Sequence, residues 1–158
     1  MNLDPCPECG AKSVGGRAGC QELYEAVANP DLGEAGLGPL RNLIFDAYCM
    51  QHPDTYCRSA KSYAAHLTRL CCAIEEDGDP QVYRAIQRWL NGAVRLDKPA
   101  VLASRGELTV ASLQIAGSPR ELQTLAQLWA DSVWQAYAAQ HELARAWIRA
   151  AARKAAGS

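Results

Sequence analysis

Hydrophobic residues recur at three- and four-residue spacing along most of the chain, which predicts α-helices separated by loops rich in proline and glycine. The first helical pattern runs from Cys20 to Asn29, and the second runs from Leu40 to His52. Each ends directly before a proline, whose ring disfavours the helical conformation of the preceding residue. Residues 30–39 hold two prolines and three glycines, so we expect a loop there.

Two further helices are predicted in the middle of the chain. After a turn at residues 53–58, Ser59 or Ser62 is placed to cap a helix. Its apolar face carries Tyr63, His66, Leu67, Leu70, Cys71 and Ile74. Asp79-Pro80 then combines an N-cap residue with proline at the first helical position, and Gly92 marks the expected end of this helix.

The last third of the chain has one weak and one strong helical signal. Residues 93–117 are interrupted by proline and glycine, and only a short helix near Thr109–Ile115 is expected. Ser118-Pro119-Arg120-Glu121 is a capping box with proline in the first turn, and no helix breaker follows before Gly157. The pattern therefore predicts one long helix over residues 118–156. Together these segments predict an all-α bundle of about five helices in a single domain over residues 1–158, with residues 20–117 forming its helices and loops.

The N-terminal segment, residues 1–20, follows a different pattern. It contains several prolines and glycines but no apolar period, so we expect it not to be helical. It also contains Cys6-Pro7-Glu8-Cys9-Gly10 and Cys20. A Cys-x-x-Cys turn directs two thiolates at one point, which favours a zinc-knuckle-like segment. A redox dithiol would normally follow a buried strand and open a helix, and the sequence predicts neither; unliganded thiols are the remaining alternative.

Three cysteines leave a tetrahedral zinc ion one ligand short. The candidates for the fourth ligand are Cys49, His52, Cys57, Cys71 and Cys72. We favour His52, because it lies at a helix end beside a loop, from which its ring can reach the N-terminal turn. Cys57 is the nearest competitor, followed by Cys49. Cys71 and Cys72 lie in the middle of a predicted helix, where free cysteine is commonly part of the core.

The other two histidines suggest an alternative site. His66 and His141 both lie on apolar helix faces, where they could join Asp46 or His52 in an open metal site with catalytic roles. The simpler interpretation is that each histidine is buried and hydrogen-bonded to a neighbour. The sequence leaves both interpretations open, and with them the question of whether the protein is an enzyme.

Basic and aromatic residues near the C-terminus allow a third hypothesis. Arg145, Arg149 and Arg153 share one helix face and could contact phosphates of a nucleic acid. Cations are also favourable near a helix C-terminus without any ligand. The four tryptophans show no pairing with basic residues, and we interpret them as core residues.

Composition and the absence of certain motifs argue against several classes of function. The chain has 16 Lys and Arg against 17 Asp and Glu, a net charge of -1, which gives no general attraction to nucleic acid or to an anionic membrane. The chain contains no nucleophile-elbow, phosphate-binding or dinucleotide motif. No run approaches the length of a membrane span, and no signal peptide is recognisable, so we expect a cytoplasmic protein. Seven cysteines in a reducing compartment argue for metal binding or burial rather than disulfides.

The motifs together resemble a bacterial family of unknown function. They are Cys6-Pro7-Glu8-Cys9-Gly10, Gly19-Cys20 with Leu23-Tyr24, Asp46-Ala47-Tyr48 with Gln51-His52-Pro53, Ser62 to His66-Leu67 with Leu70-Cys71, and then Trp129, Ser132-Val133-Trp134 and His141. The resemblance implies that Cys6, Cys9, Cys20, His52, His66 and His141 belong to the family pattern, whereas Cys49, Cys57 and Cys72 are particular to this chain. It implies no activity.

We therefore expect a zinc-binding helical protein with a structural site formed by Cys6, Cys9, Cys20 and His52. Such a site would order the N-terminal segment and leave the protein to act as a binding or regulatory module. We expect a protein or small-molecule partner, no membrane and no nucleic acid, and a homodimer is compatible with these features. The alternatives are a metal-dependent enzyme built on the inward histidines and a nucleic-acid-binding protein built on the arginine stripe.

Overall fold

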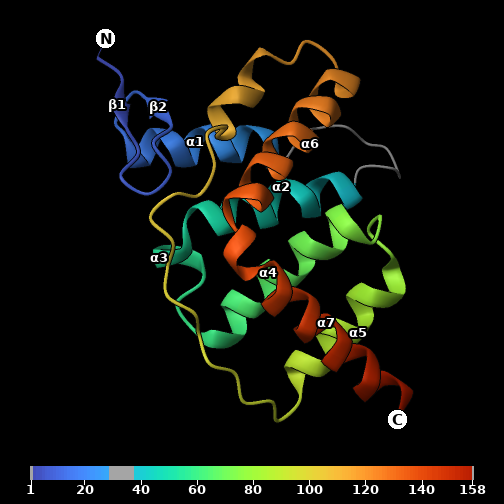
Figure 1. Cartoon of the computed structure of the whole chain (residues 1–158). Helices are drawn as coiled ribbons and strands as arrows, with labels where there is room; N and C mark the ends of the chain where they lie inside the picture. The colour runs from blue at the N-terminus through green and yellow to red at the C-terminus, as the bar shows by residue number, and fades with distance from the viewer. Residues whose placement is uncertain (1, 29–37, 158) are drawn as a thin grey trace.

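The computed structural model describes residues 2–28 and 38–157, and it confirms an all-α fold (Figure 1). Most of the loop predicted at residues 30–39 lies outside the described residues. The helices and strands are β1 Asp4–Pro5, β2 Lys12–Ser13, α1 Arg17–Ala28, α2 Gly38–Gln51, α3 Pro53–Tyr56, α4 Ala60–Glu75, α5 Pro80–Asn91, η1 Val110–Ile115, α6 Pro119–Ala136, η2 Ala138–Gln140 and α7 His141–Ala156. None of the described helices has the length and apolar content needed to cross a bilayer.

The N-terminal knuckle is a small antiparallel hairpin followed directly by a helix. β1 pairs with β2, and Gly10 adopts a positive φ of 80° in the turn between them. The prediction that residues 1–20 contain no helix is wrong for residues 17–20, because α1 begins at Arg17. Gly15 and Gly16, with φ values of 85° and 59°, turn the chain so that Cys20 lies in the first turn of this helix.

The predicted helix ends are largely confirmed, and hydrogen bonds explain them. Ser59 and Ser62 form a capping box at the start of α4. The Asp79 side chain accepts a hydrogen bond from the Gln81 N–H, and Ser118 accepts one from the Glu121 N–H. Residues 53–58, expected to be a turn, include the short helix α3.

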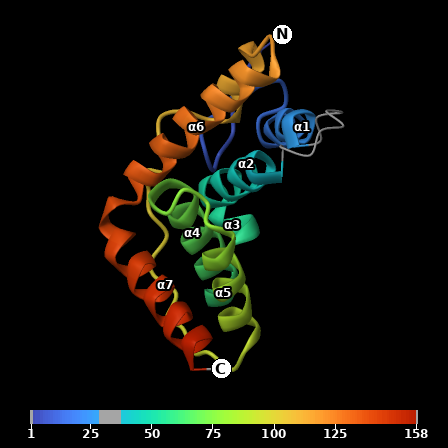
Figure 2. The same ribbon diagram turned by 90° about the vertical axis from the view of Figure 1, so that its right-hand side faces the viewer.

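α4 is the central helix of the bundle, in contact with α2, α5, α6 and α7. Figure 2 shows α6 and α7 following one another along one side of the molecule, opposite α2 and α5. The core between these helices contains large aromatic side chains, and the four tryptophans are buried as predicted. The most deeply buried of the large side chains include Trp129, Trp134, Tyr63, Tyr137 and Leu67.

The prediction of one helix over residues 118–156 is wrong, because the chain bends between α6 and α7. No proline or glycine causes this bend. Instead, the fully buried Tyr137 donates its hydroxyl hydrogen to the Met50 carbonyl over 2.5 Å. The buried Gln140 side chain accepts a 2.5 Å hydrogen bond from the Tyr63 hydroxyl and donates to the Ala100 carbonyl. These long-range hydrogen bonds hold two consecutive turns against different parts of the core.

The segment between α5 and η1, which we call the strap (residues 92–109), runs from the C-terminal end of the molecule to the knuckle (Figure 1). Gln51 fastens it: the fully buried amide donates to the Arg105 and Leu108 carbonyls over 3.0 and 2.7 Å and accepts from the Trp129 indole over 2.9 Å. Arg105 in turn donates to the Glu8 carbonyl over 2.7 Å. The strap therefore joins α2, α6 and the knuckle.

Candidate metal centre

Four side chains converge at the junction of the knuckle, α1 and the end of α2. The Sγ atoms of Cys6, Cys9 and Cys20 and a ring nitrogen of His52 all lie within 4.8 Å of one another. Among the described residues, this is the only such group of three or more potential metal ligands. It contains the four ligands predicted from the sequence.

The spacing of these atoms fits one tetrahedral ion. His52 Nε2 lies 3.6 Å from Cys6 Sγ and 3.5 Å from Cys20 Sγ, and the sulfurs of Cys9 and Cys20 are 3.6 Å apart. A zinc tetrahedron with ordinary bond lengths has edges of ~3.8 Å between sulfurs and ~3.6 Å between sulfur and nitrogen. Cys6, Cys20 and His52 are at most 2% exposed, and Cys9 is partly buried.

The His52 ring is oriented by a hydrogen bond within its own helix end. Its Nδ1 lies 2.7 Å from the Tyr48 carbonyl, so Nδ1–H donates and the lone pair of Nε2 faces the three sulfurs. This is the second-shell arrangement that metal-bound histidines usually have. Pro53 ends α2 at this point, and the Tyr48 ring packs on the imidazole with 4.0 Å between centroids. The position and tautomer of His52 therefore both follow from the end of α2.

The backbone of the knuckle supports the sulfurs. The Cys6 N–H donates to the Ala11 carbonyl and the Gly10 N–H donates to the Cys6 carbonyl, both over 2.8 Å. The Ala11 N–H points to Cys9 Sγ at 3.4 Å. This amide-to-sulfur contact is the one expected in a Cys-x-x-Cys ligand turn, and it favours the thiolate form of Cys9.

Sequence reasoning missed Glu8, which lies between the first two cysteines. Its carboxylate pairs with Arg17 and accepts hydrogen bonds from the Thr55 hydroxyl and the Asp54 N–H over 3.0 and 3.1 Å. Burial acts to raise the pKa of Glu8, but Arg17 and Thr55 outweigh burial and lower it. The signal for Glu8 in the sequence was its place as a single charged residue between two predicted ligand cysteines. Glu8 joins the knuckle to α1 and α3.

The sulfurs are electrostatically coupled. A hydrogen bond from Cys9 lowers the pKa of Cys20 to about 4, with further help from His52, and the same contact raises the pKa of Cys9. The Tyr48 hydroxyl lies 3.8 Å from Cys20 Sγ, and burial raises the pKa of Tyr48. Without a cation, the negative charge thus lies on Cys20 while Cys9 keeps its proton, and a bound cation would favour the thiolate form of both.

The other cysteines lie outside the cluster. Cys57 Sγ points to the Cys49 carbonyl at 3.6 Å, and both residues are fully buried. Cys71 and Cys72 lie on α4 near Glu75 and the Asp79 carbonyl, respectively. Burial raises the pKa of all four thiols, to about 12 for Cys57 and Cys71 and about 11 for Cys72. The described structure therefore groups His52, and not Cys49 or Cys57, with the knuckle sulfurs.

The inward histidines do not meet. His66 Nδ1 lies 2.9 Å from Asp46 Oδ1, whereas His141 Nε2 lies 2.7 Å from the Trp134 carbonyl and its ring stacks on the Trp134 indole. His52 belongs to the cysteine cluster. The open metal site considered for these histidines is not assembled among the described residues. Asp46 and His66 do form a pair.

The arginine stripe is already partly paired. Arg145 donates to both oxygens of Glu75 over 2.8 and 2.7 Å and to Glu142 over 2.8 Å. Arg149 lies 3.9 Å from a Glu142 oxygen. These contacts join α7 to α4 and engage the charges that a phosphate would otherwise contact.

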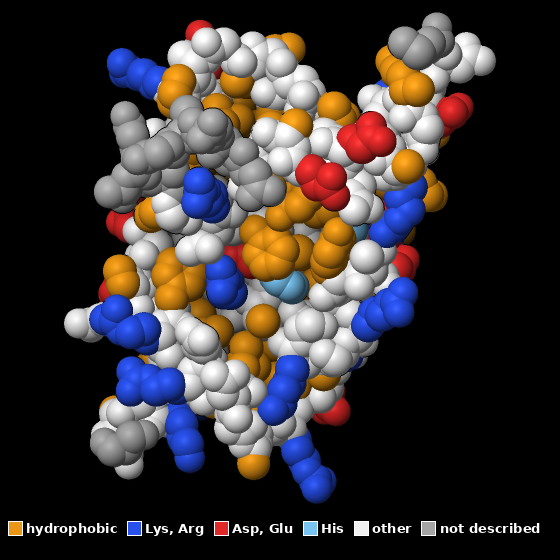
Figure 3. Space-filling view, turned by 180° about the vertical axis from the view of Figure 1, so that it is seen from behind, with side chains coloured by type: hydrophobic (Ala, Val, Ile, Leu, Met, Phe, Trp, Pro, Cys, Tyr) orange, Lys and Arg blue, Asp and Glu red, His pale blue; other side chains and the backbone are white. Residues whose placement is uncertain are grey.

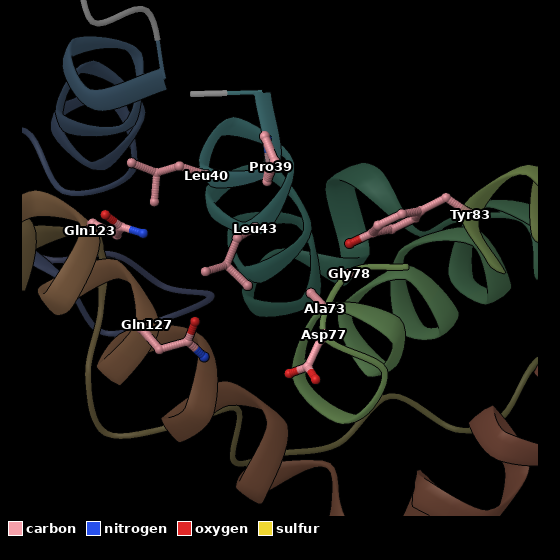
Figure 4. Close-up of a pocket in the computed structure, with 9 residues that line it drawn as sticks. All are labelled: Pro39, Leu40, Leu43, Ala73, Asp77, Gly78, Tyr83, Gln123 and Gln127. Atoms are coloured by element: carbon pink, nitrogen blue, oxygen red, sulfur yellow. The ribbon is translucent and has the colours of Figure 1, made fainter. Parts of the chain in front are cut away.

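A surface groove of about 310 Å³ lies away from the metal centre, between α2, α6 and the turn after α4 (Figure 4). Its apolar lining includes Leu40 and Leu43, and its polar groups include the Asp77 carboxylate and the Tyr83 hydroxyl. None of the predicted metal ligands lines this groove.

The fold and the cluster define a helical protein with a Cys3His group suited to holding a metal ion. A family model matches residues 4–138, and the chain belongs to this family, the family of unknown function DUF5946. Neither the curated proteins nor the solved structures contain a match. The match ends within the bend after α6, so it spans the metal centre and most of the bundle.

Proposed function

We propose that Cys6, Cys9, Cys20 and His52 bind one Zn²⁺ ion in a closed structural site, and that the protein acts as a zinc-stabilised binding or regulatory module. The observation that carries the proposal is the tetrahedral spacing of four donor atoms with His52 Nε2 directed at the sulfurs. Three thiolates and one imidazole favour zinc over the harder cations Mg²⁺ and Ca²⁺.

The donor set supports a structural site. Four protein ligands complete a tetrahedron, so no coordination position remains for water or substrate. Cys6, Cys20 and His52 are at most 2% exposed, which keeps solvent from these three ligands. The metal would hold a hairpin of two-residue strands that has little apolar surface of its own, so its binding energy would contribute to folding.

The proposed module role follows from the closed site. The exposed large hydrophobic side chains are found mainly on the knuckle, the strap, η1 and α6. They include Leu3, Val14, Leu108, Ile115 and Leu128. A metal that holds the knuckle against this end of the bundle would also fix the shape of the surface available to a protein or small-molecule partner.

The first test is metal content by elemental analysis of protein purified without added metal. We expect about one zinc per chain in the wild-type protein and a loss of most of it in Cys6→Ser and His52→Ala, because each removes one of four ligands. Cys72→Ser is the matched control: this cysteine lies outside the cluster, and serine can still donate to the Asp79 carbonyl. This variant should keep its zinc.

Two outcomes would contradict the proposal. Wild-type protein that binds no zinc, even after refolding with it under reducing conditions, would exclude the site. Zinc retained in Cys6→Ser but lost in His66→Ala would move the metal to the helical core. Circular dichroism of each variant separates loss of metal from loss of the whole fold.

A further inference from the structure

Asp46, His66 and Arg69 form a second group of polar side chains, on facing surfaces of α2 and α4. The Asp46 carboxylate is 1% exposed, and each oxygen has its own partner. His66 Nδ1–H donates to Oδ1 over 2.9 Å, and Arg69 Nε–H donates to Oδ2 over 3.1 Å. A buried carboxylate that orients an imidazole is the arrangement used to prepare a histidine for proton transfer.

The second nitrogen of His66 remains available. Because Nδ1 carries the hydrogen directed at Asp46, Nε2 of the neutral ring has a free lone pair. No described residue forms a hydrogen bond with Nε2, and the described part of the chain has no polar side-chain atom that is both buried and unpartnered. Nε2 is therefore not fully enclosed, and the His66 side chain is 13% exposed. Figure 3 shows one face of the molecule, on which exposed hydrophobic side chains lie among basic ones.

Two side chains next to His66 determine which kind of ligand could bind beside its ring. The Phe45 and His66 rings form a T-shaped contact with 5.1 Å between centroids, and Phe45 is 38% exposed, which offers an aromatic surface beside the imidazole. The Arg69 guanidinium is 32% exposed and lies 5.6 Å from the Tyr83 ring centroid. Among the described residues, its terminal nitrogens form no hydrogen bond, so they remain available to a negatively charged ligand atom.

We propose that this group, which we call the His66 site (Phe45, Asp46, His66 and Arg69), binds a small aromatic hydroxyl compound, a phenol, and accepts its proton. The ligand ring packs on Phe45 and the hydroxyl hydrogen moves from oxygen to His66 Nε2. The imidazolium so formed is stabilised by Asp46, and the phenolate oxygen faces Arg69. One proton is transferred and no other bond changes.

The acidity of the ligand favours a phenol over an alcohol or water. A phenol has a pKa of about 10 and imidazole one of about 6.5, whereas water has a pKa of about 15.7. Transfer to imidazole is less uphill the smaller the gap between the two pKa values, so a phenol gives up its proton more readily than water does. The opposite charges of Asp46 and Arg69 stabilise both products of the transfer, and an aromatic ligand is the one that also uses Phe45.

The test uses 4-nitrophenol with the full-length, metal-loaded protein, at a pH below the pKa of the probe. Binding at the His66 site should increase the visible absorbance of the phenolate, with saturation at one probe per chain. His66→Gln removes the acceptor, and Asp46→Asn can donate to Nδ1 and so reverse the tautomer. We expect either change to weaken the effect by roughly ten- to hundredfold.

His141→Gln is the matched control, because glutamine can still donate to the Trp134 carbonyl and the His66 site is untouched. It should behave like the wild-type protein. Phe45→Ala changes an exposed side chain, so it keeps the test informative if the Asp46 or His66 variants fail to fold. This variant should bind the probe several-fold more weakly. Its absorbance change at saturation should equal that of the wild-type protein.

No absorbance change with folded wild-type protein, or a change that persists in His66→Gln, would overturn the proposal. Because zinc content is measured on the same samples, failure at the His66 site is distinguishable from failure of the proposed metal site.

Discussion

At the residue scale, Gly19 determines how closely the knuckle can approach α1. A Cβ atom at this position would lie 2.1 Å from the Val14 carbonyl oxygen and 2.7 Å from Ser13 Oγ. The backbone oxygen cannot move aside without distorting the hairpin that carries Cys6 and Cys9. The next residue, Cys20, is a proposed ligand, so the same glycine places this sulfur beside the other two.

Gly19→Ala should therefore destabilise the protein by at least about 2 kcal/mol and lower its affinity for zinc, because the clash is with backbone. Urea unfolding and competition with a zinc chelator would measure the two effects. Gly157→Ala is the control: at the end of α7 an added Cβ makes only ordinary contact, 3.6 Å from the Arg153 carbonyl. Equal effects of the two changes would contradict this account.

Gln51 supports a second residue-scale prediction. Gln51→Met keeps the side-chain length but leaves the carbonyls of Arg105 and Leu108 and the indole N–H of Trp129 without their partner. Unsatisfied buried groups cost ~1–3 kcal/mol each, so we expect a loss of about 3–5 kcal/mol in the free energy of unfolding. Gln123→Met, at an exposed position of α6, should change it by less than about 0.5 kcal/mol. A small effect at Gln51 would show that the strap is not fastened there.

At the element scale, one carboxylate on α4 binds side chains of both α6 and α7. Glu75, the last residue of α4, accepts from Arg145 on α7 and from the Trp134 indole on α6. The Arg145 hydrogen bonds lower the pKa of Glu75 below its ordinary value of 4.5, against the effect of burial. The helices α4, α6 and α7 thus share one charged group near the bend between α6 and α7.

Because the folded pKa of Glu75 is lowered, this pairing stabilises the fold at pH values above 4.5, and the contribution is lost as pH falls through the folded pKa. Arg145→Gln should raise the pKa of Glu75 toward its ordinary value, as followed by carboxyl carbon NMR. The accompanying loss of stability should be small and weaker at high salt, since both groups are partly exposed. Arg149→Gln, whose nearest acidic contact is Glu142, should leave Glu75 unchanged.

At the scale of the whole molecule, the metal centre and the strap are both held by consecutive residues at the end of α2. His52 faces the knuckle sulfurs, while Gln51 holds the strap and Trp129. Arg105 on the strap reaches the carbonyl of Glu8, between two of the cysteines. The knuckle, the strap and α6 are therefore joined through two consecutive residues at the end of α2, whereas α5 and α7 pack at the other end of the bundle (Figure 2).

Removal of the proposed zinc with a chelator should loosen the knuckle and strap before the rest of the bundle. We expect amide hydrogen exchange to increase at Glu107 and Leu108, whose N–H groups donate to Ser132 Oγ, and in the β1–β2 hairpin. Amides of α5 and α7 should remain protected. Uniform loss of protection, or an unchanged strap, would contradict this coupling.

Local chemistry made much of the fold predictable. Helical periodicity, caps such as Ser59 and Asp79, and the proline after His52 indicated the main helices, because each acts within a few residues. The same reasoning missed the short hairpin and joined α6 to α7. Both errors arise where contacts outside the local segment determine the backbone conformation. β1 is ordered by pairing with β2, and the bend follows from the hydrogen bonds of Tyr137 and Gln140 to other elements.

The sequence by itself determined an all-α fold and the three knuckle cysteines of the candidate metal site, because cysteine spacing restricts what those side chains can reach. It favoured His52 as the fourth ligand but left Cys57 and Cys49 as competitors, and the tertiary structure grouped His52 with the three sulfurs. Only the tertiary structure decided which nitrogen of His52 faces the sulfurs, and only it separated His141 from His66 while pairing His66 with Asp46. Periodicity shows which face of a helix is buried. The packing of α2, α4, α6 and α7 determines which side chain each buried group meets.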